Sequence, residues 1–450
     1  MRLTMIILGI GCNLGDRLAN LREAVIRLKA IDKLTVHQVS PIYESDALLP
    51  DNAPQNWDNP YLNLALSIST KLNPEQLLAK IKTIEEKMGR LEHLHWSPRI
   101  IDIDILTWHE ECHHTDKINI PHKGLLERPF ALWPLADVAP DWKYCEPNKS
   151  ETGKSAKELI QKFGSCFDGR APLHTKQIAH RVDTPIMMGV LNITTDSFSD
   201  GGKFIDLDAA LIQAENLFDA GADIIDIGAE STRPVGAITL TPEEEWQRLQ
   251  PILDAWQSLW LHKNSMPKLS IDTRKPETAE KLLAYKIDFF NDVTGMTDPK
   301  MLEIVKASKA KIIFMHNLGI PANPAVVLPP NADSVHIVYQ WGMQQLENLI
   351  KLGIDKERLI FDVGIGFGKN AEQSFSLIKN ISQFHQLGVP LLVGHSRKSF
   401  LNQFTNKPFA ERDIETAAVS GFLTTQKVEY LRVHNVDQNM RLLKINATLL

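Results

Sequence analysis

The 450-residue sequence contains few cysteines and no long apolar run. Its four cysteines, Cys12, Cys112, Cys145 and Cys166, include no CxxC pair and are too few for a secreted disulfide framework. We therefore expect a cytoplasmic protein in a reducing environment. No apolar stretch approaches the ~18–20 residues of a membrane span. The short run Met5–Ile10 lacks the basic start and cleavage site of a signal peptide, so we expect a buried first strand there.

An excess of charge of one sign is also missing. Lys and Arg together number 49 and Asp and Glu 55, which gives a net charge of −6. This balance provides no overall field to hold the chain on nucleic acid or an anionic membrane, and we expect small-molecule partners instead. A phosphate-bearing ligand would need local positive charge, helix N-termini or a metal ion.

The sequence does have the composition and length of a multidomain globular protein. Apolar residues make up 43% and charged residues 23%, which excludes a disordered, collagen-like or coiled-coil chain. The length is about three times the ~150 residues of a typical domain. More than one domain is therefore expected.

Residues 181–450 repeat a unit of short apolar run, Gly-containing loop and amphipathic helix. Apolar strands that alternate with helices indicate a parallel sheet covered by helices. Eight such units in ~250 residues fit a closed (β/α)8 TIM barrel, and an open doubly wound sheet is the alternative. The expected strands are Pro185–Leu191, Asp223–Gly228, Lys268–Asp272, Asp288–Asp292, Lys311–Met315, Leu359–Val363, Pro390–Val393 and Tyr430–Val433.

Residues 1–165 follow a different pattern. Strand-like runs are mixed with two helices, expected at Arg17–Lys29 and Pro74–Met88, the second with Asn73 as its cap. The order βαββαβ fits an α+β domain of ferredoxin-like type. The polar residues 166–180 are expected to form the linker to the barrel domain at 181–450.

Two carboxylates stand out in the first domain. Asp102 and Asp104 are two residues apart in an expected strand, so both side chains lie on the same face. Such a pair suits one or two Mg²⁺ ions that bridge nucleotide phosphates, and solvated acids on an exposed strand are the alternative. The surrounding cations and aromatic ring favour the phosphate interpretation; they are Arg90, Trp96, Arg99, His122 and Arg128.

One nearby string imitates a zinc motif. His109–His113 matches HExxH, but it directly follows a strand and is almost entirely polar. A zinc protease needs this string on a helix with apolar flanks. We expect a hairpin tip instead.

In a TIM barrel, functional groups lie where strands end and loops begin. Nearly every expected strand of the second domain ends in a polar or charged residue, which is more than helix capping requires. The acids and amides suit an amine-rich heterocycle, and the basic groups suit an anion. The string Gly364–Lys369 lacks the spacing of a P-loop and is expected to be a ligand-facing loop with Phe367 as a wall. The polar strand ends are Asn192, Thr232, Arg233, Asp272, Asn291, His316, Asp362, Ser396–Lys398, Arg432 and His434.

The first domain resembles hydroxymethyldihydropterin pyrophosphokinase over about residues 1–160. The strings LGIGCNLGDR, YLNLAL, HWSPRIIDIDIL and PHKGLLERPFALWPL carry the resemblance. It implies a ferredoxin-like fold that transfers diphosphate from ATP to a pterin hydroxymethyl group. It also implies that Asp102 and Asp104 hold two Mg²⁺ ions. The implied pterin residues are Tyr61, Asn63, Trp96 and Phe130, the implied ATP residues are Glu85, Arg90, Arg99, His122 and Arg128, and Arg90 and Arg99 are expected to be catalytic as well.

The second domain resembles dihydropteroate synthase over about residues 184–450. MGVLNITTDSFSDGG, GAESTRP, SIDTRKP, NDVTG, FDVGIGFGKN, GHSRKSF and LRVHN follow one another in that order. The resemblance implies a TIM barrel, usually a homodimer, that joins 4-aminobenzoate to the pterin methylene and expels diphosphate. Asn192 would ligate Mg²⁺ on the diphosphate. The implied substrate residues are Asp272, Asn291, Asp362 and Lys398 for the pterin, Thr232, Arg233, Arg432 and His434 for the diphosphate, and Phe367, Ser396 and Lys398 for the aminobenzoate, with Lys398 also expected to be catalytic.

The two resemblances imply consecutive steps, because the product of the first enzyme is the substrate of the second. We therefore expect a bifunctional transferase of folate biosynthesis. One alternative is that the barrel is a pterin-dependent methyltransferase, which shares the fold and the pterin pocket. Another is that one domain is a catalytically dead binding scaffold.

Overall fold

The computed structural model describes residues 5–90, 97–178, 180–193, 207–230, 239–263 and 265–449. The chain divides into two compact units, Met1–Asp183 together with Ala447–Leu450, and Thr184–Asn446. Each unit has its own hydrophobic core. No described helix is long and apolar enough to cross a membrane.

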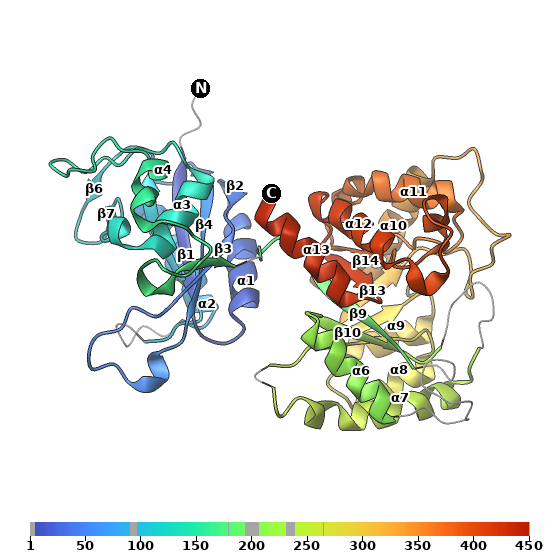
Figure 1. Ribbon diagram of the computed structural model, residues 1–450. Coiled ribbons are helices and arrows are strands. Elements are labelled where there is room, and N and C mark those ends of the chain that lie inside the picture. Colours follow the sequence, from blue (N-terminus) through green and yellow to red (C-terminus); the bar gives the residue numbers. More distant parts are fainter. Residues whose placement is uncertain are drawn as a thin grey trace. The chain divides into compact units, whose positions relative to one another are not determined.

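The first unit is built on one antiparallel sheet (Figure 1). β1 (Ile6–Cys12) lies between β4 (Tyr61–Thr70) and β5 (Asp102–Trp108). β2 (Leu34–Val39) and β3 (Ile42–Ser45) both pair with β4, so they act as one strand interrupted at Pro41, which has no backbone N–H to donate. The expected βαββαβ order and ferredoxin-like fold are confirmed.

Helices cover the two faces of this sheet unequally. α1 (Arg17–Lys29) and α2 (Pro74–Lys87) cover the face that carries Ile6, Leu8 and Ile10. On the other face, α3 (Pro129–Val138) and α4 (Ala156–Leu159) pack over Ile7, Ala65 and Leu106 at one end only. No helix among the described residues covers the remainder of that face, which forms the floor of the pocket described below.

Local signals explain the two long helices of the first unit. Asp16 accepts a hydrogen bond from the Ala19 N–H at the start of α1. Asn73 and Gln76 form a reciprocal capping box at the start of α2, where Pro74 occupies the first turn. These caps satisfy N–H groups that a helix start leaves without intrahelical partners.

The segment expected to be the linker contributes to the first sheet. Lys176–Ile178 forms β8, which pairs antiparallel with β3. Ala171 is buried against Tyr43 and Trp133. The polar composition of this segment did not predict a strand. An edge strand can form through backbone pairing with its neighbour even where it has few apolar side chains.

The second unit is a closed barrel of eight parallel strands among the described residues. β16 pairs with β9 through Tyr430–Ile186 to Val433–Gly189, which closes the sheet and excludes the open alternative. All eight expected strands are confirmed to within one residue at each end. They are β9 (Ile186–Asn192), β10 (Ile224–Gly228), β11 (Lys268–Asp272), β12 (Phe289–Asp292), β13 (Lys311–Met315), β14 (Leu359–Asp362), β15 (Leu391–Val393) and β16 (Tyr430–Val433).

Helices surround the barrel on the outside (Figure 1). Their apolar faces and the outward strand residues form the largest core cluster of the chain. The described helices are α6 (Leu207–Asp219), α7 (Pro242–Leu259), α8 (Pro276–Leu282), α9 (Pro299–Ala307), α10 (Ser334–Lys351), α11 (Ala371–Lys379), α12 (Asp413–Thr425) and α13 (Val436–Leu449).

The inside of the barrel changes from apolar to polar along its axis. Apolar side chains, among them Ile224, Phe289 and Ile360, fill the layer towards the start of the strands. Two residues further along these strands come Asp226, Asn291 and Asp362. Because side chains two apart on a strand point to the same side, these polar groups also face the barrel interior.

The fold predicts how a separate first domain should be delimited. A chain of residues 1–183 should fold alone and be more stable than a chain of residues 1–165, which lacks β8 and the packing of Ala171 and Val182. In a domain of this size, each kcal/mol changes Tm by about 2–4 °C, so we expect a difference of several degrees in thermal unfolding. Equal Tm values for the two chains would show that β8 contributes nothing to the first domain.

Candidate active sites

Two glycines form the floor of a pocket in the first unit. Gly9 lies opposite Asp104 and Gly11 opposite Asp102 in the β1–β5 pairing, so all four lie on the same face of the sheet. A Cβ at Gly11 would come within 3.0 Å of Asn63 Oδ1, and a Cβ at Gly9 within 3.0 Å of Leu106. The missing side chains therefore leave room beside the two acids, in a cavity of about 680 Å³.

Asp102 is held by two arginines. Its Oδ1 accepts from Arg90 Nη1 at 2.6 Å, and its Oδ2 accepts from Arg99 Nη1 at 2.6 Å. Burial alone would raise the pKa of Asp102, but Arg99 and Arg90 outweigh it and the pKa is lowered. Asp102 is therefore a carboxylate at neutral pH, with two guanidinium groups beside it.

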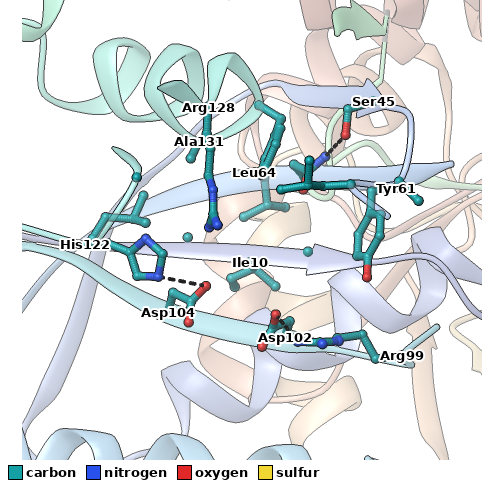
Figure 2. Close-up of a pocket in the computed structure, with 18 of the residues that line it drawn as sticks. Ile10, Ser45, Tyr61, Leu64, Arg99, Asp102, Asp104, His122, Arg128 and Ala131 are labelled. Carbon is teal, nitrogen blue, oxygen red and sulfur yellow. Dashed lines mark hydrogen bonds and ion pairs between the residues drawn. The ribbon is translucent and has the colours of Figure 1, made fainter. Parts of the chain in front are cut away.

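Asp104 has a different environment although it lies on the same face. Desolvation in the pocket and the neighbouring negative charge of Asp102 raise its pKa to about 7. Its side chain is still 43% exposed, and His122 Nε2 lies 3.8 Å from its Oδ2 (Figure 2). A second negative charge at this position is disfavoured unless a cation joins the two acids.

Glu85 lies beneath the pocket and does not line it. Its side chain is 1% exposed, it accepts from Arg90 Nη1 and from the Ile103 N–H, and it pairs with Lys82 at 2.8 Å. The resemblance implied direct contact with ATP. In the structure, Arg90 contacts both Glu85 and Asp102, so Glu85 is linked to the pocket through Arg90.

The other expected residues of the first site surround the same cavity. Tyr61, Asn63 and Phe130 line it, as do His122 and Arg128. Asn63 donates to Ser45 Oγ at 3.1 Å, and Arg128 extends from the α3 side towards the sheet in which β5 carries Asp102 and Asp104 (Figure 2). Trp96 lies outside the described residues.

A buried carboxylate organises the barrel site. Asp226 is fully buried and accepts from Arg432 Nε at 2.6 Å, Asn291 Nδ2 at 3.0 Å and Ser270 Oγ at 2.5 Å. Arg432 Nη2 also donates to Asp272 Oδ2 at 2.8 Å. The network joins side chains from four strands, β10, β11, β12 and β16, and fixes the plane of the guanidinium group.

Asp272 is the more accessible acid of this network. Burial raises its pKa to about 7, with Arg432 opposing the shift and Asp226 adding to it. Asn192 lies level with Gly228, and Gly228 lies level with Asp272 in the next pairing. Asn192 and Asp272 are thus two strands apart at the same height, with only a glycine between them.

Asp362 at the end of β14 and Lys398 after the neighbouring strand β15 influence each other electrostatically. Asp362 Oδ1 accepts from the Gly364 N–H at 2.8 Å, and burial raises the pKa of Asp362 although Lys398 opposes the shift. Burial lowers the pKa of Lys398 to about 8. Lys398 Nζ donates to the Ile365 carbonyl and lies 4.6 Å from the centre of the Phe367 ring.

The loop after β14 depends on backbone freedom and on a buried lysine. Gly364 has φ +67°, and a Cβ there would lie 1.9 Å from the His316 carbonyl oxygen. Lys369 Nζ donates to His316 Nδ1 at 2.7 Å and to the carbonyls of His316 and Gly364. His316, one of the polar strand ends, is therefore occupied in holding this loop.

Ser396 and His434 form the remaining described part of the site. His434 Nδ1 lies 3.0 Å from Ser396 Oγ, and the His434 N–H donates to the same oxygen at 3.2 Å. Arg397, which follows Ser396 in sequence, makes two hydrogen bonds to Asp413. Thr232 and Arg233 lie outside the described residues.

Sequence reasoning missed three side chains of these sites. Asp226 was overlooked because it lies inside an expected strand and not at its end, yet an acid within the apolar run IIDIG was a signal. Lys82 lines the first pocket from α2, and no motif marks it. Lys369 entered the sequence analysis only as the end of a string that lacks P-loop spacing, and its buried contacts with His316 and Gly364 were not predicted.

Comparisons with known proteins agree with this geometry. The model of the 7,8-dihydro-6-hydroxymethylpterin-pyrophosphokinase family matches residues 7–140, and the model of pterin binding enzymes matches residues 188–434. A folate synthesis bifunctional protein of Chlamydia caviae is 35% identical over 445 residues, which cover 98% of this chain and 97% of that protein. The chain belongs to the family of bifunctional folate-synthesis proteins.

Other members and single-domain structures extend the match. A mitochondrial folate synthesis bifunctional protein of Arabidopsis thaliana is 32% identical over 471 residues, covering 98% of this chain and 82% of that protein. The dihydropteroate synthase of Anaplasma phagocytophilum, solved with 6-hydroxymethylpterin-monophosphate, is 38% identical with a TM-score of 0.52. The match covers 59% of this chain and 100% of the synthase chain. The Xanthomonas albilineans dihydropteroate synthase, solved with 4-aminobenzoic acid, is 32% identical with a TM-score of 0.54. The match covers 59% of this chain and 93% of the synthase chain.

The buried network of this folate-synthesis family member predicts a stability effect. Asp226→Ala would leave the Arg432 guanidinium without its buried partner, which costs about 3–5 kcal/mol. Ser270→Ala removes only one neutral donor and should cost about 1 kcal/mol. We expect calorimetry of the full chain to show a large fall in the Tm of the barrel for Asp226→Ala and a small one for Ser270→Ala; equal effects would contradict the proposed importance of the ion pair.

Proposed function

We propose that the chain catalyses two consecutive transfers. The first moves diphosphate from ATP to 6-hydroxymethyl-7,8-dihydropterin. The second joins the resulting pterin diphosphate to 4-aminobenzoate and releases diphosphate, giving 7,8-dihydropteroate. The observation that carries the proposal is that each unit places a set of carboxylates beside arginines at an open cavity or barrel mouth.

The donor set of the first site suits magnesium. Asp102 and Asp104 offer carboxylate oxygens on one face, and Asp104 is exposed with its pKa raised to about 7 by desolvation and by Asp102. Oxygen ligands of this kind are those that Mg²⁺ prefers. Bound there, Mg²⁺ would neutralise charge on the ATP phosphates.

The remaining groups of the first pocket divide between the two substrates. Arg90 and Arg99, fixed by Asp102, would hold the phosphates of ATP, with His122 and Arg128 on the other side of the cavity. Tyr61, Asn63 and Phe130 would hold the pterin, and Trp96 belongs to this set. The hydroxymethyl oxygen then attacks the β-phosphorus of ATP, its proton is released, and AMP leaves.

In the barrel, the acceptors and donors would contact opposite ends of the pterin diphosphate. Asp362, Asp272 and Asn291 offer acceptors to the amino and N–H groups of the ring, and Lys398 offers a donor. Arg432 and His434 would bind the diphosphate, together with Thr232 and Arg233. Phe367 and Ser396 would border the aminobenzoate.

The second reaction needs a good leaving group more than a strong base. The methylene carbon–oxygen bond breaks, diphosphate leaves, and the neutral aromatic amine forms the new carbon–nitrogen bond with loss of a proton. Positive charge at Arg432 stabilises the departing diphosphate. Asn192 offers an oxygen ligand for Mg²⁺, which would add positive charge on the same side.

The proposal includes the setting of the enzyme. We propose that it acts in the cytoplasm, where its four cysteines stay reduced, and that it forms a homodimer through the barrel. Its partners are then small molecules and a second copy of itself. A methyltransferase barrel or a dead domain would fail the assays below.

Removing either carboxylate of the pair should separate the two activities. We expect Asp102→Ala and Asp104→Ala to lose ATP-dependent pyrophosphorylation almost completely, because the metal and the arginines lose their anchor. Both variants should still convert supplied pterin diphosphate and 4-aminobenzoate at the wild-type rate. Substantial kinase activity in either variant would contradict the assignment of the first site.

The lowered pKa of Lys398 predicts that binding of the pterin diphosphate depends on pH. Its pKa of about 8 means that the ammonium is charged below that pH and neutral above it. Affinity for the pterin diphosphate should therefore fall above pH 8, by at most roughly tenfold per pH unit. Calorimetric titrations should show this fall in the wild type, a flat profile for Lys398→Gln, and retained affinity at high pH for Lys398→Arg; a flat wild-type profile would remove Lys398 from the binding site.

A further inference from the structure

A cluster of soft and hard metal ligands lies in the first unit, on segments not used by either reaction. Cys112 and His114 belong to the short hairpin of β6 (His113–His114) and β7 (Asn119–Ile120). Cys145 and Glu146 lie on a second loop, closed by the bridge between Lys143 and Ser155. The two loops are 33 residues apart in sequence at the cysteines.

Three of these side chains meet, and Cys145 adds a sulfur next to that of Cys112. The sulfurs of Cys112 and Cys145 lie 2.7 Å apart, and His114 Nε2 lies 3.1 Å from Glu146 Oε1. One atom each from Cys112, His114 and Glu146 lies within 4.8 Å of the others. Within the described ranges of the chain, no other group of three or more His, Cys, Asp or Glu side chains meets this criterion.

A neighbouring group orients the histidine. His114 Nδ1 lies 3.3 Å from Asn119 Oδ1. In the tautomer that carries its proton on Nδ1, His114 donates to Asn119 and presents the Nε2 lone pair on the side of Glu146. Histidines that bind metals are fixed in this way by a second hydrogen bond.

Both loops are held by contacts of their own. Thr115 Oγ1 accepts from the backbone N–H groups of Lys117 and Ile118, which shapes the turn of the hairpin. On the second loop, Tyr144 N donates to the Lys154 carbonyl and Gly153 N to the Tyr144 carbonyl. The ligands are thus presented by two shaped loops and not by chain ends.

We propose that Cys112, His114, Cys145 and Glu146 bind one Zn²⁺ ion that joins these two loops. Two thiolates, one imidazole and one carboxylate form a four-coordinate set of the kind that zinc prefers. Ligands at about 2.0–2.3 Å from zinc lie roughly 3.3–3.8 Å from one another. The two sulfurs would therefore separate by about 1 Å on binding, with both thiol protons released.

The zinc set differs from the HExxH string that the sequence displays. His113 pairs with Glu111 at 3.1 Å, and the string lies in a turn and a hairpin strand, as expected, not in a helix. With four protein ligands the site has no open position for a water, which indicates a structural role. The hairpin leads directly into His122 and Arg128, so the metal would steady the chain that lines the first pocket.

Cobalt tests the proposal because its spectrum reports sulfur ligands. Reduced full-length protein, freed of metal under anaerobic conditions, would be titrated with Co²⁺ and then with Zn²⁺. We expect one Co²⁺ per chain with a thiolate charge-transfer band and strong tetrahedral visible bands, displaced by Zn²⁺. Binding of Co²⁺ to the oxygen ligands of Asp102 and Asp104 would give no thiolate band.

Substitutions identify the ligands. Cys112→Ser and Cys145→Ser should each lose the charge-transfer band, and Cys166→Ser, a matched control in the same unit, should keep it. His114→Ala and Glu146→Gln should weaken Zn²⁺ binding at least tenfold. Circular dichroism verifies folding, and Zn²⁺ should raise the Tm of the wild type and of Cys166→Ser only.

Any of three results would overturn the proposal. The first is the absence of a thiolate band in the reduced wild type, and the second is the persistence of that band in Cys112→Ser. The third is a Cys112–Cys145 disulfide in protein purified under reducing conditions, with no uptake of Zn²⁺ after complete reduction.

Discussion

Pairing of buried or partly buried carboxylates with arginines is the interaction on which both sites depend. Asp102 holds Arg90 and Arg99 in the first unit, and Asp226 with Asp272 holds Arg432 in the barrel. A buried charge without a partner is costly, so each pair must form when the unit folds. Folding thereby fixes the guanidinium groups that we propose to bind phosphates, so that little reorganisation would remain for the reaction.

Small residues create the space in which these charges act. Gly9 and Gly11 leave the sheet face bare beside Asp102, and Gly228 separates Asn192 from Asp272 on the barrel wall. In each unit a neighbouring acid has its pKa raised to about 7. For Asp104 the causes are desolvation and the negative charge of Asp102, and for Asp272 the main cause is burial. Each site therefore combines fixed positive charge with an acid that can bind a cation or accept a hydrogen bond.

Much of this architecture could be predicted from the sequence because its patterns are local. Apolar runs predict all eight barrel strands, and capping residues such as Asn73 help to predict the helices of the first unit. The pair Asp102 and Asp104 follows from strand alternation alone.

What could not be predicted depends on contacts between distant segments. The polar strand β8 exists because β3 offers it an edge. Glu85 is buried beneath Arg90 and Asp226 beneath Arg432, which only the packed fold reveals. The meeting of Cys112 with Cys145 likewise requires two loops that share no motif.

The central claim is that one chain performs both transfers in sequence. Its most direct test is to incubate the purified protein with hydroxymethyldihydropterin, ATP, Mg²⁺ and 4-aminobenzoate, and to quantify AMP, pterin diphosphate and dihydropteroate together. The account predicts dihydropteroate in proportion to AMP, with none formed when ATP is omitted. AMP and pterin diphosphate without dihydropteroate, or dihydropteroate only from supplied pterin diphosphate, would contradict it.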